Sequence, residues 1–144
     1  MLSIEERFAA ALHSTARSWR NALDRRLKDL GVGQASWLAI AVVAKAGKPL
    51  SQTELAHKLT VEGATMVAMI DRLVRAGLVL REPSQTDRRV KLVVLTKAGK
   101  QLYGKVRAAA DAFRAELLAD VDADQLRAAT ELLEALHSAT ESAS

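Results

Sequence analysis

The sequence has 144 residues, of which 49% are hydrophobic and 3% aromatic, with a net charge of +4 and no cysteine. This length predicts one domain, or one domain with helical extensions, and the dominance of Ala and Leu favours a core of helix packed on helix. The lack of cysteine excludes disulfides, thiolate metal sites and thiol-based redox sensing. No apolar run is long enough for a membrane span and the first ten residues do not resemble a secretory signal, so we expect a cytoplasmic protein without membrane contact.

The charge is distributed unevenly along the chain. Residues 1–67 carry +3, residues 68–97 carry +4 and residues 98–144 carry −3. This asymmetry indicates a phosphate-facing surface in the middle of the chain and a different role for its acidic end. A mixed solvated surface would explain the charge alone equally well.

Residues 3–30 are predicted to form one long amphipathic helix. Ser3 and Glu6 have the spacing of a capping box at its start, and Gly31 and Gly33 end it. A helix of this length is expected to pack against another long helix or a second subunit. Its apolar stripe consists of Ile4, Phe8, Leu12, Trp19, Leu23, Leu27 and Leu30.

Three shorter helices are predicted next, over residues 34–46, 52–59 and 64–76. Ser51 and Glu54 form a second capping box, at the start of the middle helix, and residues 60–63 form the turn that follows it. The side chains expected to face inward from the last of these helices are Met66, Ile70, Leu73 and Val74. Those expected to face outward are Thr65, Ala68, Met69 and Arg72.

A β-hairpin is predicted after Gly77. Residues 78–81 form its first strand, residues 82–87 its turn, and the second strand leads to Leu95, with Asp87, Arg88 and Arg89 at or near the tip. Helix, turn, helix and a basic hairpin form the layout of a winged helix-turn-helix DNA-binding module.

Two more helices complete the chain. Thr96 caps a long helix that runs to about residue 119, and Asp122 caps a final helix, followed by a frayed tail over residues 138–144. The predicted fold is therefore mainly α with a small β-hairpin wing: residues 34–99 form the winged helix-turn-helix region, and residues 1–33 and 100–144 form a helical dimerisation region. Pairing of the terminal helices across a two-fold axis would place two recognition helices ~34–36 Å apart, about one DNA turn.

The wing contains Asp87-Arg88-Arg89, then Leu95-Thr96 and Gly99, and the helix-turn-helix contains Ser51-Gln52-Thr53-Glu54-Leu55-Ala56, Asp71-Arg72-Leu73 and Gly77-Leu78-Val79. In these motifs and their spacing the sequence resembles the MarR family of bacterial transcription regulators, over nearly the whole chain. The first helix is similar to the SlyA-like branch in Arg17-Ser18-Trp19-Arg20, with Asp24, Arg26 and Leu27 after it, and Trp37 matches a tryptophan of that branch.

The resemblance implies a homodimer that binds a palindromic operator in double-stranded DNA, with the fourth helix in the major groove and the wing in the minor groove. It also implies release of DNA by a small aromatic carboxylate bound between the dimerisation helices and the DNA-binding module. We therefore expect a transcriptional regulator that responds to a ligand, either a repressor or an activator, and favour a repressor. The alternatives are an architectural, anti-silencing DNA-binding protein without an effector, and a winged-helix protein-interaction module, which the basic wing argues against.

The expected DNA contacts centre on the wing. Arg89 is the first candidate for the minor groove, where negative potential is concentrated, and Asp87 is expected to hold this arginine or the turn by hydrogen bonds. Arg88, Lys91 and Arg81 are candidate phosphate contacts. An alternative role for Asp87 and Arg89 is to pair and stabilise the turn alone.

The recognition helix offers little for direct base reading, which favours Arg, Lys, Asn or Gln. Ala68 stands where SlyA-like proteins often have arginine. Thr65 can touch a base or phosphate, Ala64, Ala68 and Met69 can touch thymine methyl groups, and Arg72 is expected at the DNA backbone. Much of the specificity is expected from the wing and from DNA shape, with phosphate hydrogen bonds from Ser51 and Gln52 at the preceding helix.

The candidate effector site combines cations with an aromatic wall: His13, Arg17, Trp19, Arg20 and Trp37. In the alternative assignment, both tryptophans belong to the core and the arginines lie at the surface or in a dimer contact.

No enzyme, cofactor or metal is expected. The sequence lacks a glycine-rich phosphate loop, clustered metal ligands and a nucleophile paired with a base. Ser51 and His57 are six positions apart, with no acid evidently placed to orient the histidine.

Overall fold

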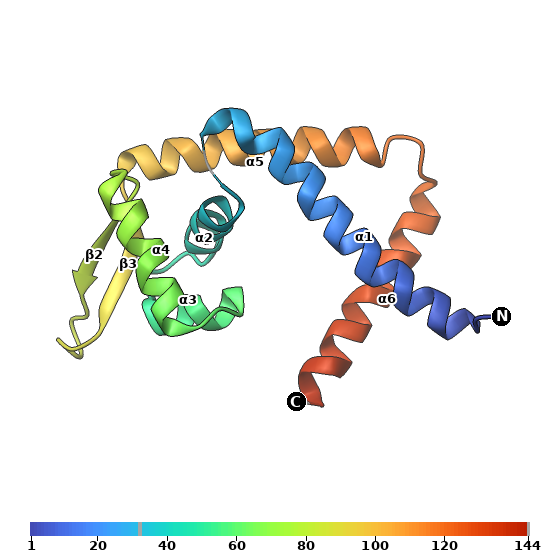
Figure 1. Cartoon of the computed structure of the whole chain (residues 1–144), viewed down its shortest axis with the longest axis horizontal. Helices are drawn as coiled ribbons and strands as arrows, with labels where there is room; N and C mark the ends of the chain where they lie inside the picture. The colour runs from blue at the N-terminus through green and yellow to red at the C-terminus, as the bar shows by residue number, and fades with distance from the viewer. Residues whose placement is uncertain (32, 144) are drawn as a thin grey trace. The chain divides into compact units, whose positions relative to one another are not determined.

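The computed structural model describes residues 1–31 and 33–143, which form α-helices and a three-stranded antiparallel sheet (Figure 1). Contacts divide the chain into two compact units, Met1–Asp111 and Ala112–Ser144. The observed mainly helical fold with a small sheet confirms the predicted fold class. The unit boundary falls later than the proposed functional boundary at residues 99–100, so the division into DNA-binding and dimerisation regions remains a prediction.

Helix α1 spans Ile4–Leu27 and continues as a short 3-10 helix, η1, over Lys28–Leu30. The predicted capping box is present: Glu6 N donates to Ser3 Oγ at 3.1 Å, and Ser3 N donates to Glu6 Oε2 at 2.8 Å. Gly31 ends the element with a φ of 74°, a conformation in which a glycine avoids the steric penalty of a side chain.

The helix-turn-helix consists of α2 (Gln34–Lys45), α3 (Gln52–Leu59) and α4 (Gly63–Arg75). The predicted bounds of α3 are confirmed, and those of α2 and α4 are confirmed to within one residue. Aliphatic and methionine side chains from these helices and the sheet form one buried core. It includes Ala39, Ile40, Val43, Leu50, Leu55, Ala56, Met66, Met69, Ile70, Leu73, Val79 and Val93.

The sheet contains β1 (Leu50–Ser51), β2 (Val79–Pro83) and β3 (Lys91–Leu95), in the order β1-β3-β2. The predicted hairpin is confirmed, with Val79 opposite Leu95 and Pro83 opposite Lys91. The predicted start of its turn at residue 82 is wrong, because Glu82 and Pro83 still pair with β3. Pro83 is tolerated there because β2 is an edge strand.

A compact junction joins the end of α4 to the start of α5 (Lys97–Leu117). Thr96 N donates to Leu78 O at 3.1 Å and Thr96 Oγ1 donates to Gly77 O at 2.6 Å. Gly99 N in turn donates to Thr96 Oγ1 at 3.0 Å, which confirms Thr96 as the cap of α5. A Cβ on Gly99 would overlap the Leu78 carbonyl oxygen, so this close approach of two backbones needs glycine.

The second unit contains the end of α5 and helix α6 (Ala123–Ser142). Asp122 caps α6 as predicted, since its Oδ2 accepts from Gln125 N at 2.9 Å. The expectation of a frayed tail from residue 138 is wrong as far as Ser142: Thr140 and Ser142 lie in regular helix and donate hydroxyl hydrogen bonds to backbone carbonyls one turn earlier. None of the helices in the described residues is both long and apolar enough to cross a membrane.

Candidate nucleic-acid interface

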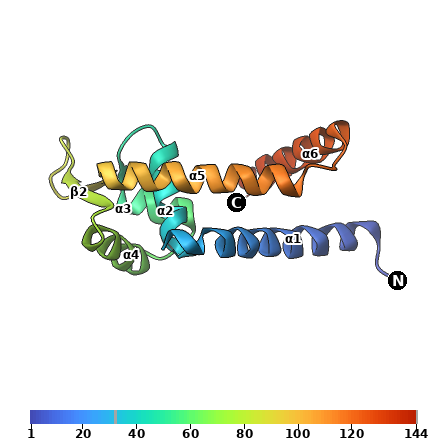
Figure 2. The same cartoon turned by 90° about the horizontal axis from the view of Figure 1, so that it is seen from above.

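The wing loop, residues 84–90, extends away from the helices of its unit (Figure 1 and Figure 2). Ser84 N donates to Val90 O at 2.9 Å and continues the hairpin ladder by one pair. The Ser84 hydroxyl oxygen accepts from Thr86 N at 3.2 Å, and Val90 N donates to Asp87 O at 3.0 Å. These local bonds define the path of the loop.

At the tip of this loop, Asp87 holds Arg89. Arg89 Nε donates to Asp87 Oδ1 at 3.2 Å and Arg89 Nη2 donates to Oδ2 at 3.3 Å. Arg89 N also donates to Oδ1, at 3.1 Å. The guanidinium beside it, and then this backbone bond, hold the pKa of the Asp87 carboxyl below its usual range. The Arg89 side chain remains 91% exposed, so it is oriented without being covered.

The other wing cations differ from one another. Arg88 and Lys91 are exposed, which leaves their charged groups accessible to phosphates. Arg81 instead faces protein groups: its Nε donates to Gln52 Oε1 at 2.7 Å, and its Nη2 lies 2.7 Å from Asp71 Oδ1. Arg81 therefore connects β2 to α3 and α4, and this geometry favours a positioning role over the predicted phosphate contact.

The N-terminus of α3 is confirmed as a capping box. Glu54 N donates to Ser51 Oγ at 3.0 Å, and Ser51 N donates to Glu54 Oε1 at 3.1 Å. The hydrogen bond from the Ser51 backbone, and then the bond with the Ser51 side chain, lower the pKa of Glu54. Ser51 and Gln52 thus have structural partners here, and their phosphate contacts remain predictions.

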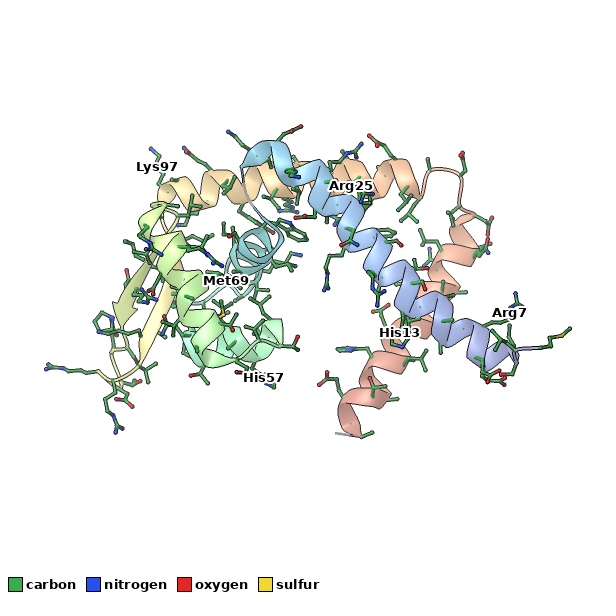
Figure 3. All side chains as sticks on the ribbon, viewed as in Figure 1. Arg7, His13, Arg25, His57, Met69 and Lys97 are labelled. Carbon is green, nitrogen blue, oxygen red and sulfur yellow. The ribbon has the colours of Figure 1, made fainter. Side chains whose placement is uncertain are left out.

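The exposed face of α4 matches the prediction at Thr65, Ala68 and Arg72, but not at Met69. Met69 is only 4% exposed and lies on the side of α4 that faces α2 (Figure 3). Its assignment as a DNA contact is therefore wrong. The buried face is rotated relative to the prediction, because Met69 belongs to the buried core together with residues of α2 and α3, while Val74 is only partly buried. The exposed face also includes Val67, a large apolar residue that is 41% exposed and that was not among the predicted outward positions.

The turn between α3 and α4 contains a strained residue. Thr60 has a φ of 54° and is the non-glycine residue with positive φ among those described. A β-branched residue is disfavoured in this region, because its Cβ crowds the backbone. The turn is closed by bonds from Thr60 N to His57 O and from Val61 N to Ala56 O.

A cavity of about 510 Å³ lies where α1 meets the helix-turn-helix. Arg17 and Arg20 line it, as predicted for an effector site, and Met69 forms part of its apolar wall. Every helix of the helix-turn-helix, α2, α3 and α4, contributes at least one lining residue to it. The full lining consists of Ala16, Arg17, Arg20, Asn21, Leu38, Leu59, Val61 and Met69.

The three other predicted effector residues do not line this cavity. Trp37 is 6% exposed and its Nε1 donates to Asp24 Oδ1 at 3.1 Å, which supports its alternative assignment to the core. Trp19 is half-buried, two positions from Arg17 and so on another face of α1. His13 lies on α1 one turn before Arg17 and is exposed (Figure 3). Within the part of the chain that the structure describes, no three His, Cys, Asp or Glu residues group as metal ligands would.

Comparison with known proteins decides the family. The sequence model of the MarR family matches residues 38–91, from α2 to the start of β3. The crystal structure of transcriptional regulator PA3341 is similar at a TM-score of 0.86 and 35% identity, over 94% of this chain and 98% of that chain. The chain belongs to the MarR family. Several of the similar structures are described as transcriptional regulators.

More distant MarR-family structures share the fold. AbsC from Streptomyces coelicolor matches at a TM-score of 0.83 and 21% identity, over 99% of this chain and 98% of that chain. A point mutant of MarR from E. coli, solved in complex with operator DNA, matches at a TM-score of 0.78 and 24% identity, over 89% of this chain and 91% of that chain. The placement within the SlyA-like branch remains a prediction.

Proposed function

We propose that this MarR-family regulator is a homodimeric repressor of the SlyA-like branch that binds a palindromic operator in the bacterial cytoplasm. In this proposal α4 enters the major groove and the wing enters the minor groove. An aromatic carboxylate in the cavity of Arg17 and Arg20 releases the DNA.

The observation that carries the DNA-binding part is the wing tip. Arg89 is presented to solvent yet held in a fixed direction by Asp87. A preoriented guanidinium suits a narrow minor groove, because less side-chain freedom is lost on binding. The operator complex of the E. coli relative supports the same use of the fold.

Direct binding to the region upstream of the protein's own gene tests this part. Labelled duplexes are titrated at several salt concentrations, with a shuffled sequence as the control. Tight binding that weakens steeply with salt is expected, since each phosphate contact releases counterions. Equal affinity for the target and shuffled sequences, at this and other candidate promoters, would contradict the proposal of a specific operator.

The observation that supports effector control is the pair of arginines on a cavity wall whose other members are largely apolar. A carboxylate can pair with a guanidinium while its ring packs on Leu38, Val61 and Met69. Because Met69 belongs to α4, a ligand in this cavity touches the recognition helix itself. Ligand affinity and DNA affinity are then linked through the position of α4.

Millimolar salicylate serves as the probe for effector control. Salicylate is expected to weaken DNA binding by the wild type, and Arg17→Ala and Arg20→Ala are expected to bind DNA but lose the response. Arg25→Ala is the matched control, because Arg25 is an exposed arginine of α1 outside the cavity lining. Tight DNA binding that ignores salicylate and related aromatic acids would instead favour an architectural, anti-silencing protein without an effector.

A further inference from the structure

We propose that α4 recognises thymine methyl groups in the major groove through Val67, with Ala64 and Ala68 beside it. This inference rests on the proposed operator binding and assigns the base that the recognition helix selects. Val67 becomes a specificity-determining residue, a role that its sequence position alone does not indicate.

Apart from Thr65, the side chains exposed on the first two turns of α4 are apolar. Val67 is 41% exposed, while Met66 and Ile70 on the opposite side are fully buried. Ala64 and Ala68 are exposed as well. Ala64 lies three residues before Val67, one turn away on the same face, and Ala68 directly follows Val67. The outer surface of α4 therefore begins with one large aliphatic side chain beside two methyl groups.

Hydrogen-bonded base reading has few groups available on this surface. Between Gly63 and Ala68, the side chain of Thr65 is the only one with a strong hydrogen-bonding group. The arginines of α4 come in its last turn. Arg72 follows Val67 by five residues, ~7.5 Å along the axis at about 1.5 Å per residue. The bidentate contacts that arginine, asparagine or glutamine make with purines are therefore not available where the helix begins.

Thymine has the matching chemistry in the major groove. Its C5 methyl group is apolar, whereas cytosine carries only a hydrogen at C5 and offers no methyl group to the same groove. An aliphatic side chain that packs on the methyl group removes apolar surface from water, and this gain is absent at cytosine. Val67 therefore favours thymine over cytosine at the same step.

The structure also fixes Val67 in place. Arg81 Nη2 donates to Val67 O at 3.3 Å and pairs with Asp71 one turn later. This arginine belongs to β2, so the base of the wing and this turn of α4 are held together. A fixed position matters for methyl recognition, because dispersion attraction falls quickly with separation.

The test replaces thymine by deoxyuridine, which removes only the methyl group. Duplexes are first selected by the wild-type protein from a random pool, and each thymine is then replaced in turn. At one or two positions per half-site we expect affinity to fall about three- to fivefold per methyl. Replacements at the ends of the duplex, outside the sequence that the protein selects, are expected to have no effect on affinity.

A double-mutant cycle with Val67→Ala connects the effect to the residue. This variant is expected to bind the thymine duplex several-fold more weakly and to bind the thymine and deoxyuridine duplexes about equally. The matched control is Leu80→Ala, which truncates an apolar side chain that is 51% exposed on β2, and which is expected to keep the preference for thymine. Thermal unfolding by circular dichroism verifies that both variants fold.

The outcomes separate this inference from the function on which it rests. Specific, salt-dependent binding with no difference between thymine and deoxyuridine overturns the inference and leaves the operator proposal standing. A thymine preference that survives in Val67→Ala also overturns the assignment to Val67. Failure to select any sequence overturns both.

Discussion

At the wing tip, one carboxylate orients one guanidinium. Asp87 accepts both side-chain bonds of Arg89 as well as its backbone N–H, so the anion and the cation act together. A negative charge near DNA would ordinarily weaken binding. In the proposed DNA complex we attribute its presence to the orientation that it gives to Arg89. This proposal predicts that neutralisation of Asp87 weakens DNA binding, although removal of a negative charge alone would strengthen it.

Substitution of Asp87 by asparagine separates the two effects. We expect Asp87→Asn to lower DNA affinity about threefold although the protein becomes more positive, and Arg89→Ala to lower it about tenfold. Glu82→Gln is the control, because it removes one exposed negative charge from the same hairpin and is expected to raise affinity slightly. Fluorescence anisotropy at fixed salt measures all three. Tighter binding by Asp87→Asn would contradict the orienting role.

The Asp87–Arg89 ion pair also leads to a prediction of how DNA affinity depends on pH. Because the pKa of Asp87 is lowered in the folded protein, the ion pair is complete above the ordinary value of 3.8 and is lost only as the pH falls through the lower, folded value. DNA affinity between about pH 5 and 8 should therefore be unaffected by titration of Asp87. Anisotropy titrations of wild type and Asp87→Asn across this range should run parallel, and curves that converge near its acid end would contradict the lowered pKa.

At the scale of single elements, the capping box of α3 fixes the start of the helix-turn-helix. Ser51→Ala should lower the free energy of unfolding by about 1 kcal/mol, because one backbone N–H at the helix start loses its acceptor. Thr53→Ala, at an exposed position of the same helix, is the control. Urea unfolding at neutral pH measures the difference, and equal stabilities of the two variants would show that the cap does not matter.

Glu54 adds a pH-dependent contribution to the same cap. Its pKa lies below the ordinary value of 4.5 in the folded protein, so its stabilisation is complete above that value and is lost as the pH falls through the lowered pKa. Because Glu54 is exposed, we expect Glu54→Gln to lose only roughly 0.3–0.5 kcal/mol at neutral pH. That difference should shrink in urea unfolding as the pH falls below 4.5; a larger difference in acid would reverse the predicted sign.

The junction between α4 and α5 depends on Gly99. Gly99→Ala should lower the free energy of unfolding by about 2 kcal/mol or more, because the new methyl group meets the Leu78 carbonyl, which is backbone and cannot rotate away. Gly104→Ala on the same helix has open space around it and should be neutral or stabilising by up to about 1 kcal/mol. Urea unfolding of the pair tests the junction, and equal effects would refute the close approach.

At the scale of the whole molecule, apolar side chains remain exposed on the terminal helices. Ile4, Phe8 and Leu12 are exposed on α1, and Leu126, Leu132, Leu133 and Leu136 are exposed on α6. Exposed apolar stripes of this kind are typical of surfaces that pair with a partner. Together with the family, they support the proposed homodimer.

A charged side chain placed in the apolar stripe of α6 should dissociate the proposed dimer. Leu133→Lys is expected to shift the sedimentation equilibrium toward monomer and to lower operator affinity at least about tenfold, because one subunit binds only one half-site. Glu134→Lys introduces the same side chain at the next, exposed position and should leave the dimer intact. A wild-type protein that sediments as a monomer at micromolar concentration would contradict the proposal itself.

Interactions between residues close together in the sequence were sufficient to predict much of the fold. The caps at Ser3, Ser51, Thr96 and Asp122 were all predicted, because each depends on a residue three positions further along the chain. The basic hairpin was predicted as well, because turn-forming residues separate two strands that are neighbours in the chain. The Asp87–Arg89 contact, also predicted, joins residues two positions apart. Hydrogen bonds of this range form wherever the local backbone allows them, so the residue order carries the information.

Only the tertiary structure decided which faces of the helices are covered and what they enclose. It buried Met69 and Trp37, paired the two residues of β1 with β3, and brought Arg81 to Gln52 and Asp71. It also assembled the cavity of Arg17 and Arg20 from four helices. Each of these features joins groups far apart in the chain, and their proximity depends on how the helices pack, which helical periodicity alone does not specify.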